Sequence, residues 1–134
     1  MEFNLNNKKI LITGGTGSFG VRCLETILNK HKPKKLVILS RDELKQYELS
    51  QKFSDKDYPC LRYFLGDVRD RNRIIRACAD IDIIIHAAAM KHVTASEYNP
   101  NECIATNIQG AQNIIDAAII NNVKRVVAIS TDKA

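Results

Sequence analysis

The sequence predicts an α/β fold, namely a doubly wound parallel sheet of about five strands in the order 3-2-1-4-5. Short apolar runs alternate with helical segments along its 134 residues, which is typical of parallel βαβ units with right-handed crossovers. These runs are apolar at successive positions, as expected for strands that are buried on both faces. A glycine-rich turn also separates the first run from the first helical segment, and doubly wound folds bind ligands at such a turn.

The first half of the chain begins with strand, loop and helix. A β-rich run at residues 9–13 ends in a cluster of glycines, and residues 18–29 after it read as the first helix. A second continuous apolar run at 35–40 predicts the next strand. The charged stretch 42–53 then predicts a helix, and residues 61–65 predict the third strand.

The second half continues the alternation, with a helix at 71–78 and a strand at 81–85 that runs into His86. The longest helix, 99–121, starts with Asn as a good N-cap and Pro in the first helical turn. The last strand, 125–130, ends a single domain that fills residues 1–134, and it should leave an unprotected edge that favours self-association. Apolar residues of the long helix recur at steps of four and three, so they should line one face against the sheet: Ile104, Ile108, Ala111, Ile115 and Ala118.

Composition and charge exclude several classes of protein. The net charge of +5 suits an anionic, phosphate-bearing ligand, but no aromatic residues are interleaved with the densest basic stretch at 30–35, so we expect no nucleic-acid partner. No run is long enough to cross a bilayer and the N-terminus lacks the apolar core of a signal peptide, which predicts a cytoplasmic protein without a membrane partner. The cysteines form no C-x-x-C pair and predict neither a metal site nor disulfides, but small apolar residues in the core: Cys23, Cys60, Cys78 and Cys103.

The turn between the first strand and the first helix carries the strongest functional signal, because its glycines satisfy the pattern G-x-x-G-x-x-G. Glycine lets the backbone turn sharply and approach a pyrophosphate, and the free N–H groups of the following helix attract that anion. A flexible turn would explain the glycines alone, but their position between strand and helix favours dinucleotide binding. The expected cofactor contacts, two of which are hydroxyl side chains, are Gly14, Thr16, Gly17, Ser18, Phe19 and Gly20. Of these, Phe19 should serve packing more than chemistry.

The end of the second strand indicates which dinucleotide is bound. Proteins of this fold that prefer NAD usually place an acidic residue there, whereas this chain has Ser40-Arg41. Arg41 can pair bidentately with a 2′-phosphate and Ser40 can donate a hydrogen bond to it, which favours NADP. Two alternatives stay open: Asp42 could still accept from the ribose of NAD, or Arg41 could merely cap a solvated helix. Lys45 is a weaker candidate for the phosphate.

Three further motifs follow the glycine loop: Gly66-Asp67-Val68-Arg69-Asp70, His86-Ala87-Ala88-Ala89-Met90-Lys91-His92-Val93 and Ser130-Thr131-Asp132-Lys133-Ala134. Together they resemble extended short-chain dehydrogenases/reductases that act as UDP-N-acetylglucosamine 4,6-dehydratases, some also inverting C5, in the synthesis of bacterial capsule, flagellin sugars and the O-antigen of lipopolysaccharide. The resemblance covers essentially the whole chain. It implies a UDP-sugar substrate, and we expect a homo-oligomer.

The resemblance also implies cofactor contacts after the third and fourth strands. The carboxylate of Asp67 would accept a hydrogen bond from the exocyclic amine of the adenine, with Val68 flanking the ring. Lys91 would lie near the nicotinamide ribose or the substrate, and Asn107 would be the structural asparagine behind the active site. Small side chains would leave room beneath the pyrophosphate and ribose: Ala87, Ala88 and Ala89.

The same resemblance assigns the chemistry to Thr131, Asp132 and Lys133, after the fifth strand. Thr131 would orient the C4 hydroxyl of the sugar, Lys133 would remove the C5 proton once C4 is oxidised, and a protonated Asp132 would protonate the departing C6 hydroxyl. A solvated turn with a local ion pair is the alternative for Asp132-Lys133. We expect His86 to be a satisfied core or loop histidine, and neither it nor His92 to transfer a proton in the reaction.

The family's Tyr-x-x-x-Lys pair, whose tyrosine removes the proton of the C4 hydroxyl, has no counterpart in these 134 residues. We therefore expect the chain to be the cofactor-binding, N-terminal half of a longer lyase, and to have negligible turnover by itself. Two other functions stay open. One is a nucleotide-sugar 4-epimerase, against which Asp132-Lys133 argues, and the other is a non-catalytic NADP-binding module.

Overall fold

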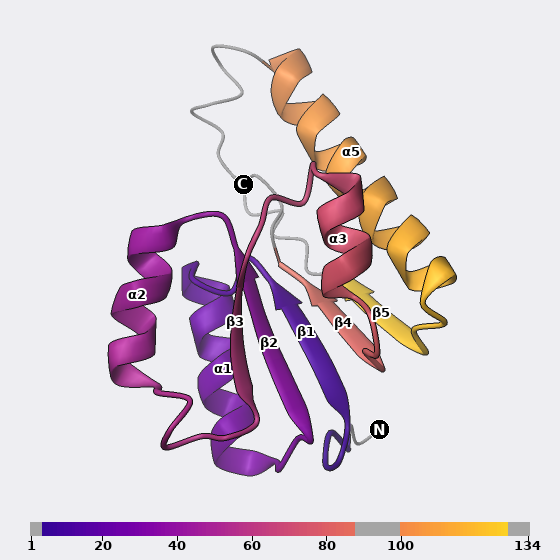
Figure 1. Ribbon diagram of the computed structural model, residues 1–134. Helices are drawn as coiled ribbons and strands as arrows, with labels where there is room; N and C mark the ends of the chain where they lie inside the picture. Colours follow the sequence, from indigo (N-terminus) through magenta and orange to yellow (C-terminus); the bar gives the residue numbers. More distant parts are fainter. Residues whose placement is uncertain (1–3, 88–99, 129–134) are drawn as a thin grey trace.

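The computed structural model describes residues 4–87 and 100–128, and over residues 100–108 it describes the backbone (Figure 1). The described residues form a parallel sheet in the order β3-β2-β1-β4-β5, which confirms the predicted doubly wound (Rossmann) topology. The strands are β1 (Lys9–Thr13), β2 (Lys35–Ser40), β3 (Leu61–Leu65), β4 (Ile83–His86) and β5 (Arg125–Ala128), and the helices are α1 (Ser18–Lys30), α2 (Glu43–Lys52), α3 (Arg71–Ala77) and α5 (Pro100–Ile120).

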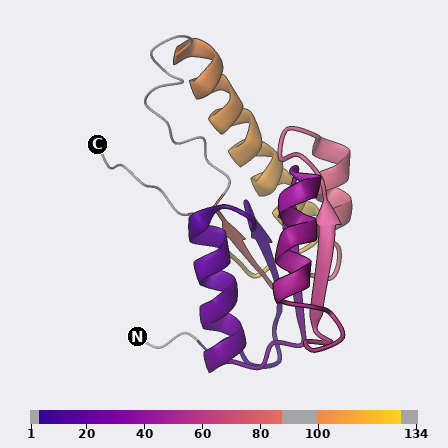
Figure 2. The ribbon, with the colours of Figure 1, turned by 90° about the vertical axis from the view of Figure 1, so that its left-hand side faces the viewer.

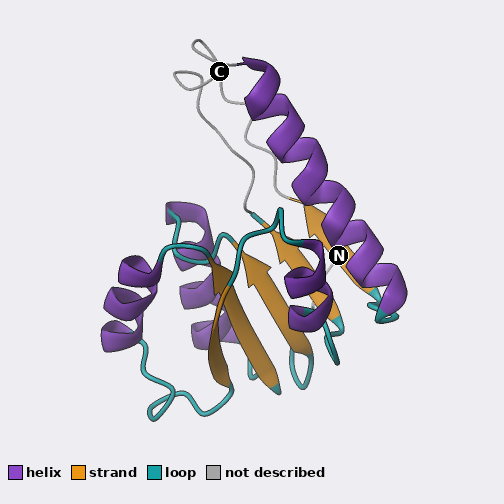
Figure 3. Ribbon diagram, turned by 45° about the horizontal axis from the view of Figure 1, so that its top comes forward, coloured by secondary structure: helices purple, strands orange, loops and turns teal. Residues whose placement is uncertain are grey.

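Successive residues of the central strands point into two hydrophobic cores, one on each face of the sheet. On one face Ile12 of β1 packs with Leu24 of α1, and on the other Leu11 packs with Ile74 of α3 and Ile114 of α5. Figure 3 shows the sheet between these two layers of helices. Coverage on both faces explains why β1, β2 and β4 tolerate apolar residues at successive positions.

The strands at the two edges of this sheet, β3 and β5, are less buried than predicted, since we expected every strand to be buried on both faces. In β3 only Leu61 is fully buried, and in β5 Val126 is 39% exposed. An edge strand has a neighbouring strand on one side only, so part of its surface stays accessible to solvent. The edge predicted for β5 is thus present among the described residues, and the self-association that it favours stays a prediction.

The face of α5 that packs on the sheet matches the predicted one at Ala118, which is buried, and differs from it at Ile115. Asn113, Ile114 and Ala117 are buried, whereas Ile115 is 47% exposed, so the prediction that Ile115 faces the core is wrong. Aliphatic residues occur almost without interruption along this part of the helix, and their spacing therefore fits more than one face. The side chains of Ile104 and Ile108 lie outside the described residues.

Other boundaries differ by a few residues. Strand β4 begins at Ile83 rather than at Ile81, although Asp82 still pairs with β1: its backbone N–H donates to the carbonyl of Lys9 at 2.7 Å, and its carboxylate accepts from the N–H of Lys9 at 3.0 Å. Ile81 is still buried in the core. The predicted end of the fifth strand at residue 130 lies outside the described residues.

Burial also accounts for the cysteines whose side chains are described. Cys78 is completely buried, and this burial raises the pKa of its thiol to about 11. Cys23 and Cys60 are half-buried against the core that includes α1, so all three act as small apolar residues. Within residues 4–87 and 100–128, no helix is long and apolar enough to span a bilayer. The same residues contain no group of three or more metal-ligating side chains.

Candidate functional site

The predicted site residues of the first four strands meet at the carboxyl edge of the sheet. Strand β1 is paired with β2 on one side and with β4 on the other, since Thr13 lies opposite both Leu39 and His86. The chain order reverses at this point, which is where open α/β sheets bind their ligands. Figure 2 shows α1 starting beside the arrowhead of β1 and running back along the sheet.

The glycine loop is held in one tight conformation between β1 and α1. Gly14 has a φ of 67°, in the left-handed region that favours glycine, and its carbonyl oxygen accepts a hydrogen bond from the N–H of Gly17 at 3.1 Å. The N–H of Gly15 donates to the carbonyl of Leu39 at 3.2 Å and ties the loop to β2. A Cβ on Gly20 would lie 2.6 Å from Cα of Gly15, so only glycine lets α1 approach the loop this closely.

The start of α1 is built to receive an anion. Its N-cap, Gly17, makes no side-chain capping hydrogen bond, and its first turn contains no acidic residue. The backbone N–H groups of that turn therefore keep their hydrogen-bonding capacity and the positive end of the helix dipole. Gly17 and Ser18 are exposed and Thr16 is half-exposed, so this end of the helix is open to a ligand. These features fit the diphosphate of a dinucleotide.

Phe19 does not serve the packing role predicted for it. Its side chain is 43% exposed and belongs to neither hydrophobic core. The residue follows the loop directly, in the first turn of α1, where no periodic pattern distinguishes the exposed side of the helix from the buried side.

A buried hydrogen-bond network joins the ends of β1 and β4. The hydroxyl of Thr13 accepts from the N–H of Ala87 at 3.0 Å and lies 2.8 Å from Nδ1 of His86. The hydroxyl therefore satisfies Nδ1 of the buried ring and the N–H of Ala87 together. Burial lowers the pKa of His86 and favours the neutral ring. This confirms the prediction of a satisfied core histidine.

The three polar residues at the end of β2, Ser40, Arg41 and Asp42, differ in their contacts and exposure. The carboxylate of Asp42 caps α2 by accepting from the N–H of Lys45 at 3.0 Å. Arg41 is therefore not the cap, and its side chain is 65% exposed at the edge of the sheet. The hydroxyl of Ser40 is buried and, of the side-chain atoms described, is the one buried polar atom without a hydrogen-bond partner. Its unused capacity fits a polar ligand group or an ordered water molecule.

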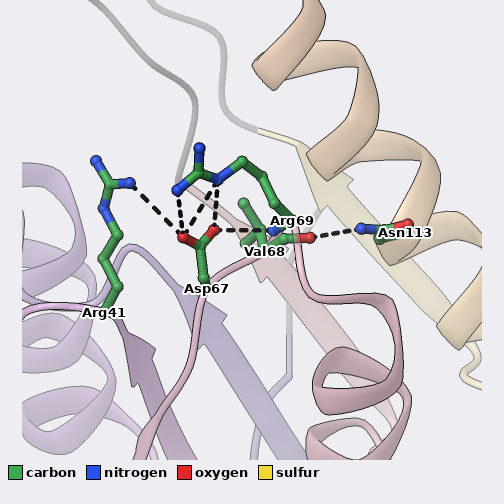
Figure 4. A network of polar contacts seen from close by, with 5 residues as sticks. All are labelled: Arg41, Asp67, Val68, Arg69 and Asn113. Carbon is green, nitrogen blue, oxygen red and sulfur yellow. Dashed lines mark hydrogen bonds and ion pairs between the residues drawn. The ribbon is translucent and has the colours of Figure 1, made fainter.

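Asp67, after β3, lies between two guanidinium groups (Figure 4). Nη2 of Arg69 donates to Oδ2 of Asp67 at 2.7 Å, and Nε of Arg69 donates to Oδ1 at 3.1 Å. Nη1 of Arg41 lies farther away, 3.7 Å from Oδ2. The side-chain hydrogen bonds from Arg69, opposed in part by burial, lower the pKa of Asp67 to about 2, and the charge of Arg41 adds to the shift.

Helix α5 fixes the loop that follows Asp67, a role that the sequence reasoning missed. The side chain of Asn113 is 1% exposed, and its Nδ2 donates to the carbonyl oxygen of Val68 at 2.8 Å (Figure 4). A Cβ on Gly110 would lie 2.9 Å from Cγ2 of Val68, so glycine permits the close approach of helix and loop. The polar Asn113 and the helix-disfavouring Gly110, three positions apart in the middle of α5, were the available signal.

Protonation of Asp67 should weaken the fold at low pH. Because its pKa is about 2 in the folded chain, below the ordinary 3.8, its contribution to stability is present above the ordinary value and is lost as pH falls through about 2. In urea unfolding followed between about pH 5 and pH 2, the midpoint of Asp67→Asn should fall less than that of the unaltered chain. Asp57→Asn, which removes an exposed carboxylate in the segment between α2 and β3, is the matched control. Parallel curves for Asp67→Asn and the unaltered chain would contradict the assignment.

Several predicted site residues are not placed by the structure. They lie outside the described residues and their roles stay predictions: Ala88, Ala89, Lys91, the side chain of Asn107, Thr131, Asp132 and Lys133.

Known proteins share this arrangement. The family described as polysaccharide biosynthesis protein matches residues 10–134. The UDP-N-acetylglucosamine 4,6-dehydratase (inverting) of Campylobacter jejuni subsp. jejuni serotype O:2 is 59% identical over 129 residues, which cover 96% of this chain and 38% of that protein. A UDP-glucose 4-epimerase of Rickettsia bellii is 44% identical over 131 residues, which cover 96% and 38% respectively.

A solved structure with bound ligands shows the same fold. The DesIV double mutant, a dTDP-glucose 4,6-dehydratase from Streptomyces venezuelae with NAD and DAU bound, matches with a TM-score of 0.81 and 29% identity, over 92% of this chain and 39% of that one. The chain therefore spans a little over a third of these proteins, 38% in the case of the curated relatives.

Proposed function

The chain belongs to the family of polysaccharide biosynthesis proteins, and from this we propose that it is the N-terminal, NADP-binding part of a UDP-N-acetylglucosamine 4,6-dehydratase. The observation that carries the proposal is the 59% identity, over 96% of the chain, to a protein of that name. The open start of α1 beside the glycine loop supports dinucleotide binding. In this proposal the whole protein is a cytoplasmic, homo-oligomeric lyase of surface polysaccharide synthesis.

The polar residues after β2 support NADP rather than NAD. One oxygen of the Asp42 carboxylate, Oδ1, is engaged as the cap of α2, which leaves a single oxygen to accept from a ribose hydroxyl. Arg41 presents an exposed guanidinium at the same strand end, and guanidinium groups bind phosphates bidentately. We assign the 2′-phosphate to Arg41, with Ser40 and Lys45 as secondary contacts.

The proposed reaction removes water from the sugar. A bound nicotinamide would supply the hydride acceptor for C4 and the hydride donor for C6, and a proton would return to C5 as that hydride reaches C6. The C4 ketone acidifies the C5 proton, which Lys133 removes as the base. Asp132 donates its proton to the C6 oxygen, which leaves as water, while Thr131 orients the C4 oxygen. The base for the C4 hydroxyl is the tyrosine that the family resemblance places after these residues.

Turnover of the sugar tests the proposed reaction. The longest protein that the reading frame encodes is incubated with UDP-N-acetylglucosamine, and the product is identified by NMR spectroscopy. A 4-keto-6-deoxy sugar is the expected product. UDP-N-acetylgalactosamine as sole product would favour the 4-epimerase instead, as the 44% identity to an epimerase also permits. Binding of NADP without any turnover would favour a non-catalytic module.

Arg41→Ala should weaken NADP binding selectively. Loss of a charge-assisted contact to the 2′-phosphate should raise the dissociation constant for NADP by roughly tenfold to a hundredfold, while that for NAD changes by less than about threefold. Calorimetric titration of the chain with each dinucleotide measures both. Lys124→Ala, which removes an exposed positive charge before β5 at the opposite edge of the sheet, controls for net charge. Equal losses for NADP and NAD would refute the assignment to the 2′-phosphate.

A further inference from the structure

Two arginines, Arg41 and Arg69, lie beside Asp67. The cofactor contacts assigned so far, at the glycine loop and at the end of β2, give Arg69 no role. We propose that Arg69 is a specificity-determining residue for the cofactor: it neutralises Asp67 and so leaves Arg41 available to a 2′-phosphate. This role rests on the proposed binding of NADP. It concerns the selection of the cofactor and not the reaction that follows.

The contacts show that Arg69 is the principal partner of Asp67. Its side chain reaches both carboxylate oxygens, at 2.7 Å and 3.1 Å, and its backbone N–H donates to Oδ1 at 2.9 Å. Because the two residues are separated by a single position in one turn, the pairing forms locally and needs no ligand. The contact between Arg41 and Asp67, at 3.7 Å, is longer than any of these hydrogen bonds.

The charges of the cluster decide what it can bind. A lone carboxylate 3.7 Å from Arg41 would hold that guanidinium and would repel an incoming phosphate. With Arg69 in place, two guanidinium groups surround one carboxylate and the cluster keeps a net positive charge (Figure 4). The side chains of Arg41 and Arg69 are 65% and 48% exposed, so both remain accessible from solvent.

The position of the cluster directs this charge at the adenosine end of the cofactor. Asp67 and Arg41 follow neighbouring strands, since Ser40 of β2 lies opposite Leu65 of β3. The hydrogen bond from Asn113 to the carbonyl of Val68 holds the same turn against α5. Arg69 thus lies on a turn that α5 holds in place, beside Arg41, the residue assigned to the 2′-phosphate.

The test is a double-mutant cycle on cofactor selectivity, measured by calorimetric titration of the chain with NADP and with NAD at one ionic strength. Arg69→Gln should weaken NADP binding by about fivefold to thirtyfold and NAD binding by less than about threefold. Adding Asp67→Asn to Arg69→Gln removes the unbalanced carboxylate, and should restore most of the preference for NADP. Arg71→Gln, which removes an equal charge two positions away from a pair with Asp116, should leave the ratio of affinities unchanged.

The outcomes separate this role from the proposed function. If the unaltered chain prefers NADP but Arg69→Gln keeps the same preference, or if Asp67→Asn restores nothing, the role of Arg69 is refuted and the proposed function stands. If the unaltered chain binds neither dinucleotide, both fall. Arg69→Lys keeps the charge without the two-pronged contact, so an intermediate preference is expected from it even where Arg69→Gln unfolds the turn.

Discussion

Replacement of Gly20 by alanine should abolish tight binding of the dinucleotide and destabilise the fold. The added Cβ would lie 2.6 Å from Cα and 2.8 Å from the carbonyl carbon of Gly15, and would also clash with the carbonyl oxygen of Gly14. These are backbone atoms of a turn that is hydrogen-bonded to β2, so helix and loop must separate. We expect binding to weaken at least about a hundredfold, or about 2.8 kcal/mol, and the free energy of unfolding to fall by about 1–3 kcal/mol.

Calorimetry and urea unfolding measure these two effects, and Gly17→Ala supplies the matched comparison for stability. A Cβ on Gly17 would meet the carbonyl oxygen of Gly14 at 3.4 Å, an ordinary contact, and the φ of Gly17 is −76°, which alanine adopts freely. Its free energy of unfolding should therefore change by less than about 0.5 kcal/mol. Wild-type affinity and stability in Gly20→Ala would show that the close approach of α1 to the loop is not needed.

The sequence was sufficient for the order of the strands, which follows from the alternation of elements and the topology of doubly wound folds, and for the glycine loop, which is a local pattern. The apolar run at 35–40 has the same limits as β2, since a strand covered on both faces leaves no position for a polar residue inside it. The loop was recognised because three glycines occur where a strand passes into a helix. The buried, hydrogen-bonded state of His86 followed from its place at the end of an apolar strand.

The contacts between distant segments could not be read from the sequence in the same way. Asn113 and Val68 are 45 positions apart, and nothing local in either motif indicates that they form a hydrogen bond. The amide of Gln46, which donates to the carbonyl of Phe64 at 2.9 Å and so ties α2 to β3, was missed for the same reason. Arg69 lies within a recognised motif, but its pairing with Asp67 depends on the conformation of the turn.

Replacement of Lys133 should stop the proposed reaction after its first half, which is the second large effect that we expect. In the longest protein that the reading frame encodes, Lys133→Ala removes the base for the C5 proton and should lower turnover by about 10²–10⁴-fold. In the proposed reaction, oxidation at C4 does not require this residue. A rapid-mixing experiment should therefore show the near-ultraviolet absorbance of reduced nicotinamide appearing after UDP-N-acetylglucosamine is added, and then persisting.

Two measurements distinguish a proton-transfer role for Lys133 from a loss of charge or of folding. Lys133→Arg keeps the positive charge but cannot lose a proton near neutral pH, so it should be as inactive as Lys133→Ala. Exchange of the C5 proton with deuterated solvent should vanish in both variants. In Asp132→Asn, by contrast, Lys133 is intact, so exchange at C5 should continue while loss of the C6 hydroxyl is slowed. Active Lys133→Arg, or exchange at C5 that survives in Lys133→Ala, would show that another group is the base and that the ion pair with Asp132 is merely structural.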